Sequence, residues 1–210
     1  MNVTERMTEM RRFLQGLLLL LLLSCVTGCS PSASESSPYV ELKLDSFQNE
    51  EGVFQFSELP LGISLEEAKE KVYIRYPFPG YSEGSWEFYN STEPTYIYGE
   101  GKTSSTSSAQ MEFDNGKLIR VRFKFTTDPD YEDPVIAQLT QTHYEDMMPK
   151  LEDLYGPPDS TEEEGETVVH IWLGEEDTML RLSHGPGKGR EAESMILSLA
   201  MGQAADWKEV

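Results

Sequence analysis

Three histidines are the side chains of this sequence best suited to acid–base or metal chemistry. They are His143, His170 and His184. A metal or catalytic cluster on one element would show a spacing such as HxH, HExxH or paired His and Cys, and none occurs in the sequence. We therefore predict isolated imidazoles, at the surface or half-buried, with neither a metal site nor a catalytic histidine.

Carboxylates are abundant, but none marks a cation-binding loop. Residues 128–139 begin like a calcium-binding loop, yet the sixth position is Asp133 instead of Gly and the twelfth is Leu139 instead of Glu. A second acidic run covers residues 162–166. We interpret both as solvated acidic loops, with adventitious binding of a divalent cation as the alternative for the first.

Three further patterns of catalytic sites are missing. The glycine-rich segment 185–190 has Gly189 after Lys188, where a phosphate-binding P-loop needs Ser or Thr. We interpret it as a flexible hairpin connection, with contact to a small anion or a partner as the alternative. No serine lies in a GxSxG elbow, and no pair of carboxylates is distinct from the general excess. The sequence thus predicts a protein that is not an enzyme and has no cofactor.

Aromatic density is the feature that most suggests a binding surface. Nine aromatic residues fall between positions 73 and 98, several of them among Pro, Gly and Ser. Exposed Tyr and Trp side chains give a partner a large contact area at low entropic cost. The alternative is that these side chains cover the open end of a sheet and fill the core. The residues that we select as a tentative binding site are Tyr76, Phe78, Tyr81, Trp86 and Tyr89.

The N-terminal segment has the organisation of a signal peptide. A mostly polar stretch ends in Arg11-Arg12, and an apolar stretch over residues 14–26 includes seven consecutive leucines. A helix of about 13 residues rises about 20 Å, which is short of the ~30 Å hydrocarbon core of a membrane. The pattern therefore favours the hydrophobic region of a signal peptide over a permanent span.

The segment Val26-Thr27-Gly28-Cys29 resembles the lipobox of bacterial prolipoproteins. The resemblance implies a thioether-linked diacylglycerol on Cys29, cleavage between Gly28 and Cys29, and acylation of the new amine. Acyl chains contribute about 0.8 kcal/mol per buried CH2 group, so two or three of them anchor a protein stably. The alternatives are an ordinary leucine-rich signal with a chance cysteine and an uncleaved N-terminal anchor. Because Cys25 would leave with the signal, the mature chain would have no thiol for a disulfide.

Charge narrows the class of partner. The chain has 17 Lys and Arg against 37 Asp and Glu, which gives a net charge of −20. Phosphate contacts need clustered basic side chains, so we predict no nucleic-acid partner. A basic surface that binds anionic lipid is equally disfavoured. With 38% hydrophobic and 10% aromatic residues, the chain can still fill a core.

Local signals predict a helix followed by strands, twice. Ser64 and Glu67 form a capping box at the start of the first helix. The second helix ends at Tyr155, and Pro149 marks a kink in it or a late start. We expect a loose tail over residues 202–210. Apolar residues at strand spacing predict strands near residues 86–89, 94–98, 107–113, 117–125, 166–173, 178–184 and 193–201.

The turn at residues 114–116 determines which side chains of its hairpin point inward. A two-residue loop would pair Met111 with Arg120. A three-residue loop, with Gly116 in the left-handed bulge position, pairs Met111 with Ile119 and keeps one apolar face, so we prefer it. An outward stripe then forms a second candidate surface, with cross-strand pairing to acidic neighbours as the alternative. The stripe consists of Arg120, Arg122 and Lys124.

These elements predict an α+β fold of two tandem helix-plus-strand halves, with the helices packed on one face of an antiparallel sheet. The segments Leu61–Glu67 and Leu154–Pro157 resemble small lipoproteins with BamE/SmpA-like or β-lactamase-inhibitor-like repeats. That resemblance implies binding of other proteins through the sheet or its loops. We expect a signal peptide at 1–28, a lipidated cysteine and Ser/Pro-rich tether at 29–50, and halves at 51–133 and 134–210.

The sequence therefore predicts a lipid-anchored, extracytoplasmic, non-catalytic module that binds another envelope or extracellular protein. The N-terminal lipid would hold it at the outer face of the cytoplasmic membrane, or in the periplasm at the outer membrane. The alternatives are a solute- or glycan-binding lipoprotein that uses the aromatic segment 76–98 and, less favoured, an envelope hydrolase.

Overall fold

The described part of the chain belongs to one unit, Pro38–Val210. This computed structural model describes residues 39–73, 76–78, 86–90, 95–100, 104–127, 134–187, 194–204 and 207, without the side chains of residues 76–78, 86–90, 127, 136 and 137. The predicted signal peptide, the lipobox with Gly28 and Cys29, and residues 30–38 of the tether lie outside the described residues.

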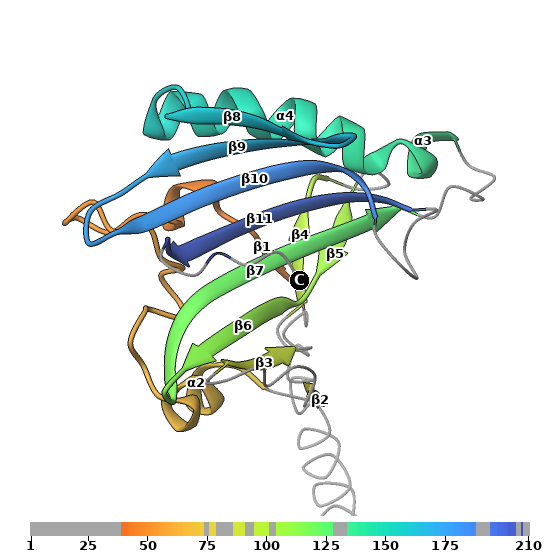
Figure 1. Ribbon diagram of the computed structural model, residues 1–210. Coiled ribbons are helices and arrows are strands. Elements are labelled where there is room, and N and C mark those ends of the chain that lie inside the picture. Colours follow the sequence, from red (N-terminus) through yellow and green to blue (C-terminus); the bar gives the residue numbers. More distant parts are fainter. Residues whose placement is uncertain are drawn as a thin grey trace, which may run out of the picture. The chain divides into compact units, whose positions relative to one another are not determined.

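Strands, arranged in two sheets, are the predominant element of the described structure (Figure 1). The larger sheet has the order β2-β3-β6-β7-β11-β10-β9-β8, and the smaller has the order β1-β4-β5 with β1 parallel to β4. The strands are β1 (Tyr39–Glu41), β2 (Tyr76–Phe78), β3 (Trp86–Asn90), β4 (Thr95–Tyr98), β5 (Ser105–Ser107), β6 (Ala109–Asp114), β7 (Lys117–Thr127), β8 (Ser160–Glu164), β9 (Thr167–Leu173), β10 (Thr178–Pro186) and β11 (Met195–Gln203).

Helical segments are fewer and mostly short. They are the 3-10 turn η1 (Leu44–Ser46) and the helices α2 (Leu65–Lys71), α3 (Pro134–Ala137) and α4 (Leu139–Tyr155). None of the helices in the described ranges combines the length and the apolar character that a membrane span requires.

The predicted α+β fold of two tandem halves is wrong, because the chain is mostly β and its large sheet is continuous. β7, from the expected first half, pairs with β11, from the expected second half, along eight residue pairs. α2 has only seven residues, and the acidic run that we expected to be a loop contributes the edge strand β8. Joining two β-rich segments through β7 and β11 leaves fewer unpaired strand edges than two separate sheets would.

The signals at the helix termini are confirmed. The Ser64 hydroxyl accepts a hydrogen bond from the backbone N–H of Glu67, and the Glu67 carboxylate accepts one from the backbone N–H of Ser64. α4 ends at Tyr155, as predicted, and Gly156 follows with a φ of 82°, a conformation that favours glycine. The helical assignment of α4 continues through Pro149.

The predicted register of the β6–β7 hairpin is wrong because the bulge lies elsewhere. Asn115 and Gly116 have φ values of 48° and 74° and form a two-residue turn. The register then shifts between Glu112 and Phe113, so that Glu112 pairs with Arg120 and Met111 pairs with Val121. The bulge accommodates one extra residue, which lets the hairpin keep both a tight turn and an apolar face.

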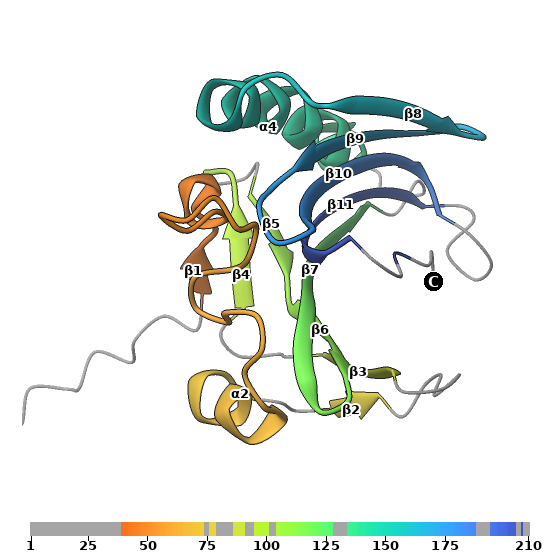
Figure 2. The same ribbon diagram turned by 60° about the vertical axis from the view of Figure 1, so that its left-hand side comes forward.

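The core lies on one face of the large sheet, the face that carries α4 and the N-terminal segments (Figure 2). α4 contributes Met147 and Leu151 to it. The Phe123 ring on β7 lies 5.0 Å from the rings of both Phe56 and Tyr96, so it joins the small sheet to the large one. Alternate residues of β7, β10 and β11 are buried on this face, as their spacing predicted: Val121, Phe123, Phe125, Leu180, Leu182, Leu197, Leu199 and Met201.

Candidate functional site

The structure does not describe the side chain of any residue in the predicted aromatic site. Tyr81 lies outside the described residues altogether. Tyr76 and Phe78 occupy β2, and Trp86 and Tyr89 occupy β3, where only the backbone is described. The aromatic site therefore stays a prediction.

Three other aromatic residues of that segment are described, and their surroundings differ. Tyr96 is 1% exposed, and its hydroxyl donates a hydrogen bond to Glu58 over 2.8 Å, so it belongs to the core. Tyr73 is exposed. Tyr98 is buried except at its edge, and its hydroxyl donates a hydrogen bond to Asp146 on α4 over 2.5 Å. Of these three, Tyr98 lines the concave surface on which the candidate site is built.

That surface is a groove of about 590 Å³ between the N-terminal segment and α4. The buried side chains of Leu42 and Leu44 lie beside the half-exposed Leu154 of α4, and together they give the groove an apolar wall. Its remaining lining is polar and comes from the same two segments and β4: Glu41, Lys43, Asp45, Tyr98, Lys150 and Asp153.

Hydrogen bonds hold the polar wall of the groove in place. Lys150 donates to Asp146 over 2.6 Å, and its Nζ lies 5.6 Å from the centre of the Tyr98 ring. Burial alone would raise the pKa of Asp146, but the hydrogen bonds from Lys150 and Tyr98 outweigh it and hold this pKa below its ordinary value. Asp146 is therefore ionised at neutral pH, and burial together with this carboxylate raises the pKa of Tyr98.

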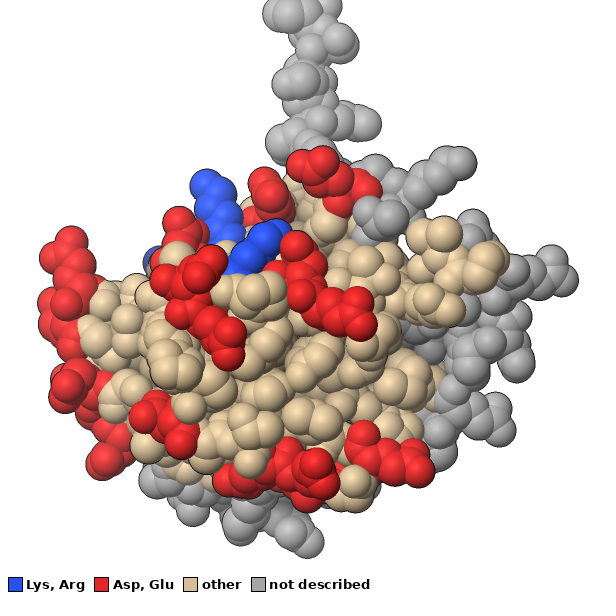
Figure 3. Space-filling model, turned by 90° about the horizontal axis from the view of Figure 1, so that it is seen from above, with Lys and Arg blue, Asp and Glu red and all other residues tan. Residues whose placement is uncertain are grey.

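The face of the molecule that carries α4 and β8 is acidic at its margins (Figure 3). In this view Asp and Glu side chains surround a broad area without charge, and Lys or Arg side chains gather at one side only. The groove shares this excess, because its lining has three carboxylates and two lysines, one of which is already paired with Asp146. The groove can therefore bind an apolar group that has positive charge near it.

The histidines are neither isolated nor exposed, in contrast to the prediction. All three are buried: His143 at 3% exposure, and His170 and His184 at 8% each. The Tyr144 ring of α4 is stacked with the imidazoles of both His170 and His184. Each of these two histidines lies two residues from an apolar residue that faces the core, and so shares its strand face: Trp172 for His170 and Leu182 for His184. This two-residue spacing from a core residue was the signal in the sequence that His170 and His184 would face the interior and lie close together.

The basic stripe is also buried in part, and the cross-strand alternative is confirmed. Arg120 is 1% exposed and forms an ion pair with Glu112, its register partner on β6. Arg122 lies 3.7 Å from the other carboxylate oxygen of Glu112. Trp207, in the segment expected to be a loose tail, stacks on the Arg120 guanidinium at 3.9 Å. Arg120 is thus a structural residue of the sheet and not part of an open surface.

Comparison with known proteins finds no matching family model, no matching curated protein and no matching solved structure. Within the described ranges, no three His, Cys, Asp or Glu side chains are arranged to hold a metal ion. The groove between the N-terminal segment and α4 is accordingly the concave surface on which we base a function.

Proposed function

We propose that this chain is a lipid-anchored, extracytoplasmic, non-catalytic module that binds a cationic, partly apolar segment of another envelope or extracellular protein. The lipobox at residues 26–29 supports the anchor. Nine residues lie between Cys29 and the first described residue, Tyr39, and the ten fully extended steps from one to the other span at most about 35 Å. The domain would therefore work close to the membrane surface.

The groove is the observation that carries the binding proposal. Its apolar wall of Leu42, Leu44 and Leu154 suits an apolar side chain of a partner, and its acidic excess suits Lys or Arg beside it. Residues 41–45 line the groove and lie within the segment that we predicted as tether, of which the structure places residues 39–50 in the folded unit; the groove would therefore be held near the membrane. A partner that is itself anchored there would meet the groove at a high effective concentration.

A second candidate function is binding of a solute or glycan. It is favoured by one observation, namely that the Tyr98 edge and the polar groups of Lys150 and Asp153 line the same groove. Aromatic edges with nearby hydrogen-bonding groups are typical of small-ligand sites. The two candidates are distinguished by the captured molecule, which protease treatment destroys only if it is a protein.

Replacement of Cys29 by serine tests the anchor. A serine hydroxyl does not form the thioether, so we expect Cys29→Ser to lose incorporation of labelled fatty acid and to abolish cleavage after Gly28. Labelling in cells followed by immunoprecipitation measures the first, and the mass of the N-terminal peptide measures the second. Unchanged labelling of the serine variant would contradict the lipobox.

Replacement of Leu154 by lysine tests the groove. Leu154 is 46% exposed, so the change removes an apolar contact and adds a repulsive charge without disturbing the core. We expect Leu154→Lys to weaken binding of a purified partner segment at least tenfold, with the melting temperature unchanged. Leu173→Lys is the matched control, because Leu173 is also exposed, at 61%, and does not line the groove.

The partner segment for this measurement is obtained by crosslinking the full chain in envelopes and identifying the crosslinked peptide. Binding is then measured by titration of that synthetic peptide at low and at high salt. Equal affinities for the Leu154→Lys and Leu173→Lys variants would reject the groove as the site, and affinity that rises with salt would reject a cationic partner.

A further inference from the structure

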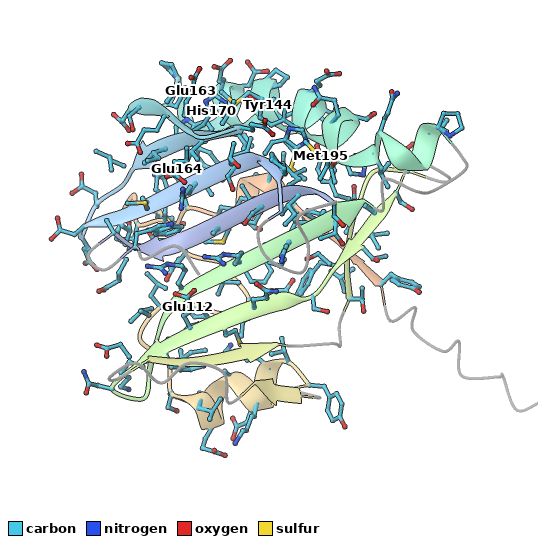
Figure 4. The ribbon with its side chains drawn as sticks, turned by 45° about the vertical axis from the view of Figure 1, so that its right-hand side comes forward. Glu112, Tyr144, Glu163, Glu164, His170 and Met195 are labelled. Atoms are coloured by element: carbon cyan, nitrogen blue, oxygen red, sulfur yellow. The ribbon has the colours of Figure 1, made fainter. Side chains whose placement is uncertain are left out.

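The surface by which α4 packs on the two sheets contains all three histidines of the chain, since His143 meets Tyr98 of β4 in the small sheet and the other two lie on the large sheet. His143 lies on α4, His170 on β9 and His184 on β10. Figure 4 shows Tyr144 and His170 at one corner of the molecule, where α4 meets β8 and β9, with Glu163 of β8 nearby. The side chains of the three histidines therefore contribute to one contact, that of α4 with the strands beneath it.

Two of these imidazoles pack closely against tyrosine rings. His143 meets the Tyr98 ring edge-on, with the ring centres 5.1 Å apart. His184 lies flat on Tyr144, with the ring centres 5.0 Å apart and the planes within 13°. The Nε2 atoms of His143 and His184 are buried and have no hydrogen-bond partner among the described residues. A proton added to either ring would place a charge where no described group accepts its hydrogen bond.

His170 differs because both of its ring nitrogens are satisfied. Its Nε2 lies 2.7 Å from the Tyr144 hydroxyl, and its Nδ1 lies 3.0 Å from the Thr161 hydroxyl of β8. Hydroxyl groups can either donate or accept, so these two contacts suit both the neutral and the protonated ring. His170 therefore holds α4 to β8 and β9 in either state, and the sensitive rings are those of His143 and His184.

We infer that the docking of α4 on the sheet is an acid-sensitive switch, which loosens when His143 and His184 become protonated. Neutral rings pack against Tyr98 and Tyr144, whereas charged rings require water. Opening the helix from the sheet supplies that water. The inference concerns α4 itself, and it holds whether or not the groove binds the proposed partner.

The charged groups around the three rings do not cancel this effect. The carboxylate of Asp146, itself paired with Lys150, favours the protonated form of His143. Glu145 does the same for His184, and Glu152 for His170. Glu163 lies at the β8 edge. Burial lowers the pKa of all three histidines, and it outweighs the opposite effect of the carboxylate nearest to each. The folded state thus binds fewer protons than the unfolded state near pH 6.5.

The sign of the pH dependence follows from this difference. Because the pKa values are lowered by folding, docking is fully stable above about pH 6.5, the ordinary pKa of histidine. Stability is lost as the pH falls below that value, and the loss ends once the folded state is protonated too. Each unit by which a pKa is lowered corresponds to a tenfold change in the opening equilibrium.

Amide hydrogen exchange of the full chain tests the inference. The ratio of protection factors between α4 and β7 is measured at pH 7.5 and at pH 5.0, after correction for intrinsic exchange rates. We expect this ratio to fall several-fold at pH 5.0 in the wild type and to fall much less in the double variant His143→Phe/His184→Phe, in which only His170 remains to be protonated. Phenylalanine keeps the ring contacts with Tyr98 and Tyr144 but cannot be protonated.

Tyr144→Phe is the matched control, because it removes the hydroxyl bonded to His170 and keeps the ring that covers His184. Its acid sensitivity should persist. A constant ratio in the wild type, an equal loss of protection in β7, or an undiminished fall in the double variant would each overturn the inference. Should the double variant fail to fold, NMR titration of the imidazole Cε1–H signals decides: His143 and His184 must titrate below pH 6.5.

Discussion

Glu112→Ala is expected to destabilise the protein by about 3–5 kcal/mol, the usual cost of removing one partner from a buried ion pair. Glu112 is 5% exposed, and its carboxylate pairs with Arg120 and approaches Arg122. Burial lowers the pKa of Arg120 to about 10, so its guanidinium is still charged at neutral pH. Without Glu112 that charge would lie in the sheet without its main counterion. Unfolding in urea at pH 7 measures the loss.

The double variant Glu112→Leu/Arg120→Met provides the control. It removes both charges and fills the space with apolar groups of similar size, which proteins tolerate well. We expect the double variant to recover most of the stability that Glu112→Ala loses. A loss under 1 kcal/mol for Glu112→Ala would show instead that Trp207 or solvent supplies the compensation.

As a single variant, Phe123→Ala is expected to lower the free energy of unfolding by about 3–5 kcal/mol, as large-to-small changes of buried phenylalanines do. Phe123 is fully buried, and its ring contacts those of Phe56 and Tyr96. The cavity would lie between the two sheets, which no other element can fill without moving. Thermal and urea unfolding measure the effect, and the groove should lose partner affinity in parallel because β4 carries Tyr98.

An exposed residue supplies the comparison for Phe123. Leu173→Ala removes a side chain that is 61% exposed, and surface changes of this kind usually stay within about 0.5 kcal/mol. A similar loss for both variants would mean that Phe123 does not join the layers.

Much of the local structure could be predicted from the sequence, because it depends on neighbouring residues. The capping box at Ser64, the end of α4 at Tyr155 and the inward positions of Phe123 and Leu199 all follow from spacing within a few residues. These local preferences appear unchanged in the structure because the tertiary packing favours the same conformations.

The errors arose where distant segments meet. The pairing of β7 with β11 has no local signal, since both strands would also suit separate sheets. The bulge after Glu112 could not be read from the turn, because the turn residues alone suit both a two-residue and a three-residue loop. Arg120 lies on the face away from the core, as predicted, but it is buried there because Glu112 and Trp207 cover it. The candidate groove depends on η1, β4 and α4 together, and only Tyr98 among its residues lay in the predicted aromatic segment.

The junction between β7 and β11 also affects how the chain must fold. β7 can form its hairpin with β6 early, since one two-residue turn connects them, but its other edge waits for Met195–Gln203. Contacts between strands so far apart in sequence form slowly, and an open strand edge can meanwhile pair with another chain. We therefore expect refolding to be limited by closure of β11 onto β7, with aggregation competing at high protein concentration. The strand that completes the sheet thus also ends the period in which the chain is vulnerable.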